Sequence, residues 1–362
     1  MVNWVIEGRH SEKLQLILKN KIAWLLMSFY LLHMIGMLWT ENKASGWFDL
    51  EVKSSLFIFP LIFSSIKIEK RNILKSFVLG CVSAGIISLS LALIHFILTG
   101  ENHFEYTFFS YILHPTYFAM YVDFAIVVLL FDNKPNGNER NKIINISLFI
   151  FLSLIVIMLA SKTGTILLGM IIIVFVVHQM IINKKSVFGP IIFSSFVLLI
   201  LLAIKFFPYT IERIKTGIYI FTHTEQINAE SSESNAVRVL IWKTDMDAVK
   251  RFWIYGTGTG DVTDELVKLY IGKNYLQLAD ERLNAHSQIF QTTIALGFAG
   301  TAVLFLGFIA SALISFKSKN NILLIFTAIA FITFTVESML EVQAGVMFYS
   351  FINSMLIFNH ND

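Results

Sequence analysis

The chain has 362 residues, of which 56% are hydrophobic, and it contains 34 phenylalanines but only 5 prolines. Its mean hydropathy of +0.68 excludes a soluble globular domain, and its net charge of +3 gives no indication of a nucleic-acid-binding protein. Cys81 is the single cysteine, which excludes intrachain disulfides and cysteine-based metal sites. Repeated apolar runs that can cross about 30 Å of hydrocarbon therefore predict an all-α polytopic membrane protein.

Ten apolar segments follow one another along the chain, at residues 22–40, 54–66, 76–98, 115–131, 143–160, 163–182, 187–207, 287–315, 322–338 and 344–358. We expect each of them to be a transmembrane helix. The segment 54–66 is short and contains Pro60, so it either begins earlier, near Trp47, or is bent or re-entrant. We expect it to cross the membrane.

These segments divide the chain into three parts. Residues 1–207 are predicted to form an N-terminal transmembrane bundle, residues 208–285 a long polar loop, and residues 286–362 the C-terminal transmembrane helices. Such a layout places a large extramembrane surface next to the point where the chain re-enters the bilayer.

The long loop has structure of its own. Residues 235–252 carry apolar side chains near helical spacing, and a second helix is predicted after Asp261 or Thr263. The run Gly256–Gly260 between them resembles a phosphate-cradling turn, but it has neither a preceding strand nor a following Lys-Ser/Thr. We therefore expect a tight turn between two short helices.

The basic residues orient the bundle. With the N-terminus in the cytoplasm, the cytoplasmic segments are 1–21, 67–75, 132–142, 183–186 and 316–321, and together they contain fifteen lysines and arginines. The short outer loops contain only Lys43, Lys53 and Lys162. The positive-inside rule therefore predicts that both termini are cytoplasmic and that the long loop lies outside, which is the periplasm for a bacterial inner membrane.

Three residues could carry chemistry at the outer surface. His286 stands where the long loop re-enters the membrane, and a histidine there can accept a proton from a hydroxyl. Taken alone, it could also be an interfacial histidine that only contacts water or headgroups. Arg238 and Lys162 would face the same compartment, where a single cation often only contacts lipid phosphate. Together the three suit a diphosphate leaving group.

Four further residues are possible supporting members of a site. His114 and Tyr117 lie at the start of a span, a position that helix capping alone would explain. Glu337 and Glu341 flank the outer end of another span, where a carboxylate is costly unless it is paired or hydrated. Arg238 or Lys162 could be the partner of these carboxylates. No HExxH, GxSxG or P-loop pattern appears, which disfavours a hydrolase or an ATPase.

The order of these pieces resembles the O-antigen ligase and O-antigen polymerase superfamily of bacterial surface-glycan enzymes. The pieces are SKTGTILL from Ser161, RVLIW from Arg238, FWIYGTGTGD from Phe252, NAH ending at His286, and ALGFAG from Ala295. In addition, HPTYFAMY from His114 and ESMLEVQAGVMFYSF from Glu337 resemble its ligase-like branch.

The resemblance implies a glycosyltransferase that needs no metal and no other cofactor. It would move a glycan from undecaprenyl diphosphate to a sugar hydroxyl of lipid A-core at the periplasmic face of the inner membrane, with inversion at the sugar. Arg238 and Lys162 would bind the diphosphate, and His286 would act on the acceptor hydroxyl. The family usually has arginine where this chain has Lys162, and lysine lacks the bidentate fork.

The sequence leaves alternatives open. An O-antigen or exopolysaccharide polymerase would share the fold and the donor, and a protein O-glycosylating relative would share the chemistry. A transporter of lipid-linked glycans would instead favour ionisable groups deep in several spans and inverted repeats, and we find no internal repeat. The expected partners are the lipid-linked donor, the acceptor and membrane lipids, with no nucleic acid; the oligomeric state is not predicted.

Overall fold

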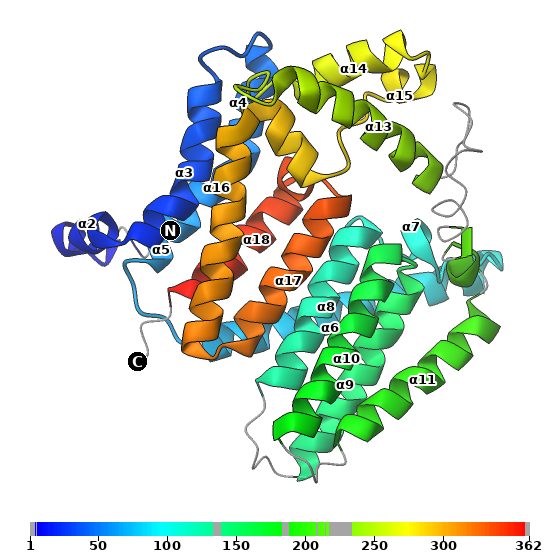
Figure 1. The fold of residues 1–362 in the computed structure, drawn as a ribbon. Helices are drawn as coiled ribbons and strands as arrows, with labels where there is room; N and C mark the ends of the chain where they lie inside the picture. Colours follow the sequence, from blue (N-terminus) through cyan, green and yellow to red (C-terminus); the bar gives the residue numbers. More distant parts are fainter. Residues whose placement is uncertain are drawn as a thin grey trace. The chain divides into compact units, whose positions relative to one another are not determined.

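A computed structural model of the chain describes residues 4, 6–132, 139–182, 188–207, 209–213, 215–216 and 234–358. All regular structure in these residues is helical (Figure 1). Helices suit a chain of this composition because they satisfy the backbone hydrogen bonds within each segment, which hydrocarbon demands. The all-α prediction is thereby confirmed for the described part of the chain.

The helices pack into two compact units, one made of Met1–Ile68 with Ile220–Asp362 and the other of Glu69–Tyr219. We call them the first and the second unit and describe each separately. The three-part division of the chain into bundle, loop and C-terminal helices describes which residues lie within the membrane and which lie outside it. This division stays a prediction.

The first unit combines the start of the chain with its second half. Its elements are α2 (His10–Lys19), α3 (Lys21–Gly36), α4 (Lys43–Lys53), α5 (Ser55–Phe63), α13 (Ser234–Phe252), α14 (Val262–Gly272), α15 (Leu276–Asp280), α16 (Gln288–Ser318), α17 (Asn321–Val336), the 3-10 helix η2 (Met339–Glu341) and α18 (Gln343–Ile357). The loop helix predicted at 235–252 is confirmed as α13. Only Ser54, itself in helical conformation, separates α4 from α5, so the helical path into the segment 54–66 starts before Trp47.

The second unit consists of α6 (Lys70–Thr99), α7 (Tyr106–Phe109), α8 (Pro115–Phe131), α9 (Glu139–Met158), α10 (Lys162–Ile182) and α11 (Phe188–Phe206). The bounds of α8 coincide with the predicted segment 115–131. It begins at Pro115 because the first helical position needs no N–H donor.

Length and composition identify a membrane protein. Four helical segments are long and apolar enough to cross a bilayer, namely Lys70–Thr99, Lys162–Ile181, Gly189–Phe206 and Gln288–Ser318. Four shorter apolar helices accompany them, at Lys21–Gly36, Pro115–Phe131, Ile143–Met158 and Asn321–Val336. The count of about ten spans and their orientation stay predictions. Parts of the loop (217–233) and of the basic segments (133–138 and 183–187) lie outside the described residues.

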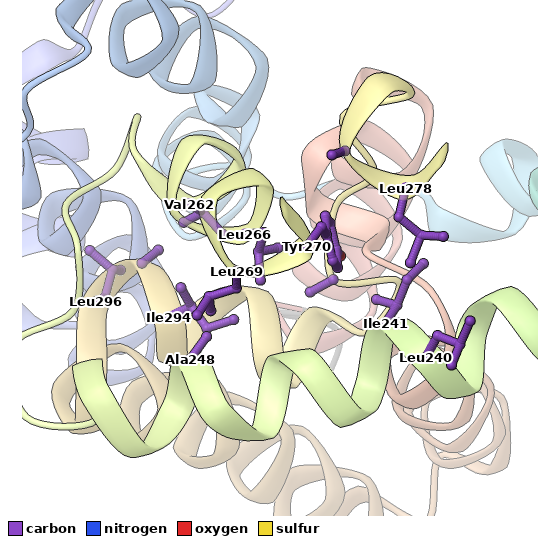
Figure 2. Packing of buried hydrophobic residues seen from close by; sticks show 13 residues of the cluster. Leu240, Ile241, Ala248, Val262, Leu266, Leu269, Tyr270, Leu278, Ile294 and Leu296 are labelled. Carbon is purple, nitrogen blue, oxygen red and sulfur yellow. The ribbon is translucent and has the colours of Figure 1, made fainter. Parts of the chain in front are cut away.

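The loop helices form a hydrophobic layer on the first turns of α16 (Figure 2). The buried side chains of this layer come from α13 (Leu240, Ile241, Ala248), α14 (Val262, Leu266, Leu269, Tyr270), α15 (Leu278, Ala279), Ala285 and α16 (Ile294, Ala295, Leu296). Residues 234–285 of the loop are thus not a linker but a packed part of the first unit.

Helix α16 is broken at Gly297, whose φ of 62° and ψ of −151° interrupt the helix. Residues with side chains rarely adopt this conformation. The break exposes two carbonyls, and the turn after α13 satisfies both: Thr257 N–H donates to Ile294 O over 2.8 Å and Gly258 N–H to Ala295 O over 3.0 Å. The glycine-rich run is therefore the tight turn that the sequence favours, and these two N–H groups serve a broken helix rather than a phosphate.

The same turn is also hydrogen-bonded to α3 and, through Asp261, to the connection between α3 and α4. Thr259 Oγ1 donates to the carbonyl of His33 over 2.6 Å. The Asp261 carboxylate accepts from the backbone N–H groups of Glu41 and Asn42, each over 2.7 Å. Asp261 does stand at the N-cap position of α14, but its side chain caps a neighbouring loop instead of its own helix.

We expect Gly297→Ala to lower the melting temperature of the purified protein in detergent by several degrees. The backbone conformation costs a residue with a side chain on the order of 1–3 kcal/mol. In addition, a Cβ at this position would clash with the Ile254 carbonyl oxygen. The matched control is Gly272→Ala, whose Cβ would meet nothing within 4 Å. Equal melting temperatures for both variants would contradict this description of the break.

Candidate active site

Three predicted site residues meet in the first unit. Glu337 Oε1 lies 3.1 Å from His286 Nδ1, and Glu337 Oε2 lies 2.8 Å from Arg238 Nη2. Each oxygen of one carboxylate thus contacts one of the two other groups. Arg238 is one of the two partners that the sequence suggested for Glu337.

The three side chains differ in exposure. The Glu337 side chain is 10% exposed, whereas those of Arg238 and His286 are 21% and 25% exposed. The Glu337 carboxylate is therefore the most buried of the three groups. The Arg238 guanidinium and the His286 imidazole each keep a face that a ligand can reach. A carboxylate shielded from water in this way also holds its two partners more firmly than a surface carboxylate would.

Helix α13 contributes two side chains from one face. Arg238 and Trp242 are four residues apart, so they project from the same side of the helix. While Arg238 pairs with Glu337, the indole Nε1 of Trp242 donates to the backbone carbonyl of His286 over 3.3 Å. The Arg and Trp of the RVLIW segment therefore act together, which the sequence alone did not reveal.

The backbone of His286 is held in the left-handed region, with φ of 42°. Residues other than glycine rarely adopt this conformation, and it costs about 1–3 kcal/mol unless the surroundings impose it. Here the Asn284 side chain accepts the His286 N–H over 3.0 Å, and Trp242 holds the carbonyl. The Asn-Ala-His sequence thus fixes the histidine immediately before α16 begins.

Gln288, the first residue of α16, ties the histidine segment to the Glu337 segment. It is fully buried. Its backbone N–H donates to Glu337 O over 3.2 Å, its Oε1 accepts from Leu340 N over 2.7 Å, and its Nε2 donates to Glu341 Oε1 over 3.3 Å. These bonds set the register between the two segments. Sequence reasoning missed Gln288 because its partners lie far away along the chain.

Glu341 has a different partner from the one expected. Its Oε2 lies 2.8 Å from Nζ of Lys53, whose side chain is fully buried and also lies 3.4 Å from Asp49 Oδ2. The sequence indicates Lys53 only as a basic residue of an outer loop. A lysine four residues after an aspartate is the only local signal, and it does not identify Glu341 as the second partner.

The other predicted site residues belong to the second unit, and their place at the site stays a prediction. Lys162 begins α10 directly after Ser161, whose hydroxyl accepts the Gly164 N–H over 3.2 Å. His114 caps α8, because its Nδ1 accepts from Thr116 N over 3.4 Å, and its ring lies 6.1 Å from that of Tyr117. The capping function that the sequence suggested for His114 is thus confirmed.

The loop layer also encloses an acid and a phenol. Asp245 on α13 and Tyr270 on α14 are fully buried. Burial raises the pKa of Asp245 well above its usual range, and burial together with the nearby Asp245 charge raises the pKa of Tyr270. Both side chains belong to the buried core of the layer.

One group in the second unit could supply three metal ligands, namely His95, Glu101 and His103. Its two imidazole rings are stacked, with centroids 3.5 Å apart and planes inclined by 16°. The lone pairs of stacked rings run side by side instead of converging on one point. A metal bound by both histidines would require one ring to turn.

A comparison with protein families identifies the central part of the chain. Residues 147–305 match the family model described as O-antigen ligase. This segment is similar to the O-antigen ligase family. It contains Arg238, Trp242 and His286 together with the whole loop layer, and the superfamily resemblance is thereby confirmed.

The match supports the O-antigen ligase superfamily, and with the apolar helices it indicates a membrane-bound, glycosyltransferase-like enzyme of glycan synthesis that acts on lipid-linked substrates. Glu337 and Glu341 lie beyond the matched residues, so their link to the O-antigen ligase segment comes from the geometry alone. No curated protein matches the chain.

We expect Lys53→Met to destabilise the protein strongly, by about 3–5 kcal/mol, because it leaves buried carboxylates without their cation. The measurement is thermal unfolding of the purified protein in detergent. Adding Glu341→Gln to this variant should recover part of the loss, since it removes one unpaired charge. The control is Lys268→Met, which removes an exposed partner of Glu265 and should change little. A single Lys53→Met variant as stable as the wild type would contradict a buried ion pair.

Proposed function

We propose that the protein is an O-antigen ligase, which transfers a glycan from undecaprenyl diphosphate to a sugar hydroxyl of lipid A-core without a metal ion. The observation that supports this most is the shared contact of Arg238 and His286 with one carboxylate. It brings an anion-binding group and a proton acceptor within reach of one substrate, inside the O-antigen ligase segment.

The proposed reaction is a displacement at the anomeric carbon. The acceptor hydroxyl oxygen attacks this carbon while its proton passes to Nε2 of His286. The bond from the anomeric carbon to the phosphate oxygen breaks, and undecaprenyl diphosphate leaves as an anion. The Arg238 guanidinium stabilises the charge that develops on the leaving group, with Lys162 as the proposed second cation. Attack from the face opposite the leaving group inverts the configuration.

The proposed location follows from the charges and the apolar segments. About ten spans would place both termini in the cytoplasm and residues 208–285 in the periplasm of a bacterial inner membrane. The lipid tail of the donor would remain in the bilayer while its diphosphate reaches the site at the surface. Fixed cations would perform the function that Mg²⁺ performs in many phosphate-dependent enzymes.

A polymerase would use the same donor and the same three residues but would take a second lipid-linked glycan as acceptor. The two activities differ in the surface that binds the acceptor. Complementation of a strain that lacks the gene separates them.

We expect His286→Ala to abolish transfer, by at least about 100-fold, because the proton acceptor is lost. The measurement is the lipopolysaccharide gel of the deletion strain that carries each variant, with the amount of protein in the membrane measured alongside. The wild type should restore the full ladder, whereas His286→Ala should leave bare core and accumulated lipid-linked polymer. The control is His10→Ala, a histidine on an exposed position of α2.

Each alternative gives its own pattern in the same experiment. Core with a single repeat unit in the deletion strain would indicate a polymerase. An unchanged ladder in that strain would contradict a function in lipopolysaccharide synthesis, and a ladder restored by His286→Ala would remove this residue from the mechanism.

We expect the two proposed cations to respond differently to exchange between lysine and arginine. Arg238→Lys should raise the KM for the donor about tenfold, because lysine loses the fork that contacts a carboxylate and a phosphate at once. Lys162→Arg should leave the activity equal or higher, since it restores the residue usual in the family. A folded but inactive Lys162→Arg protein would contradict the proposed contact of Lys162 with the diphosphate.

A further inference from the structure

We propose that Glu337 is a positioning residue that keeps His286 in the tautomer able to accept a proton and that, by its charge, weakens the binding of anions at Arg238. The first part rests on the proposed transferase function. The second part concerns only the charges of the site and can be tested without turnover.

The tautomer follows from the atoms in contact. An ionised carboxylate only accepts hydrogen bonds, and Glu337 forms an ion pair with Arg238, whose guanidinium lies 2.8 Å from Oε2. The imidazole atom at 3.1 Å from this carboxylate is Nδ1. The hydrogen of the neutral ring therefore lies on Nδ1, and Nε2 carries a lone pair. This is the atom that would accept the proton of the acceptor hydroxyl.

Glu337 is fixed from several sides. It follows the last residue of α17 in an extended conformation, with φ of −151° and ψ of 141°. Its carbonyl accepts from the N–H groups of Gln288, over 3.2 Å, and of Met339, over 2.9 Å. Four residues further on, the pair of Glu341 and Lys53 anchors the same segment. The carboxylate is thus placed before any substrate arrives, so that it can orient His286 without reorganisation.

The same negative charge opposes the binding of a diphosphate. Two like charges about 4 Å apart repel by about 1 kcal/mol in water and by more in a partly buried site. Glu337 also occupies one donor of the Arg238 guanidinium. Glu337 thus supports the proton acceptor and at the same time weakens the binding of the leaving diphosphate. This combination favours turnover over tight binding.

Glutamine at this position separates the two effects. Its amide has the shape of the carboxylate but only one acceptor oxygen, whereas both Arg238 and the Nδ1 hydrogen of His286 require an acceptor. With the amide oxygen on Arg238, the amide NH₂ faces Nδ1 and favours the tautomer that has its hydrogen on Nε2. The charge that repels diphosphate is removed at the same time.

The experiment compares Glu337→Gln with the wild type in two assays. The first measures the affinity for inorganic pyrophosphate by calorimetry in detergent, and we expect the variant to bind about fivefold more tightly. The second measures kcat with lipid-linked glycan and lipopolysaccharide core that are both extracted from the deletion strain, and we expect a loss of at least about 100-fold. The control is Asp247→Asn, which removes an exposed carboxylate of the same helix that carries Arg238 and should change neither value.

Opposite changes in affinity and kcat distinguish positioning from a structural defect, since a damaged site would lose both. Weaker pyrophosphate binding by Glu337→Gln, or full turnover, would overturn the inference. If the glutamine variant does not fold, Glu337→Asp provides the test, because it keeps the charge and the acceptor character. A folded aspartate variant should bind pyrophosphate as the wild type does, and tighter binding would overturn the assigned effect of the charge.

Failure of the proposed function gives a different result. In that case the wild type would not use the extracted donor, although the comparison of pyrophosphate affinities would still test the effect of the Glu337 charge. A wild type that is active, beside a Glu337→Gln variant of equal activity, would contradict only the function assigned to Glu337.

Discussion

The carboxylate of Glu337 is the point on which the candidate site depends. It joins three elements that are far apart in the sequence: α13 through Arg238, the entrance of α16 through His286, and the end of α17 to which it belongs. A buried carboxylate with two hydrogen-bonded partners is costly to disturb, because removing either partner leaves charge unsatisfied. The contact therefore fixes the loop against the membrane helices at the position where chemistry is proposed.

The backbone beneath the site is organised around the break in α16. Gly297 interrupts the helix, and the turn after α13 supplies the N–H groups that the broken segment lacks. An unsatisfied carbonyl is expensive in an apolar environment, so the glycine-rich turn and the broken helix require each other. Because α13 leads directly into this turn, the same arrangement also sets the position of Arg238. Rigid placement of a few polar groups is what a site needs to stabilise charge without reorganisation.

Local features of the sequence predicted much of this structure. Apolar runs located the apolar helices, Pro115 marked the start of α8, and the polar interruption with His286 at its end indicated the candidate site. The sequence could not predict contacts between segments that lie far apart along the chain. The cost of a carboxylate at a helix end showed that Glu341 needed a partner, but nothing local identifies Lys53, which lies 288 positions away. Trp242 and Gln288 act through bonds to backbone atoms, which leave no chemical pattern in a single sequence.

An experimental structure of the protein in a lipid nanodisc, at a resolution that shows side-chain orientation, tests the shared carboxylate most directly. We expect one Glu337 oxygen within hydrogen-bond distance of His286 Nδ1 and the other beside the Arg238 guanidinium. A Glu337 side chain turned away from His286, or an imidazole that presents Nε2 to it, would contradict the proposed site.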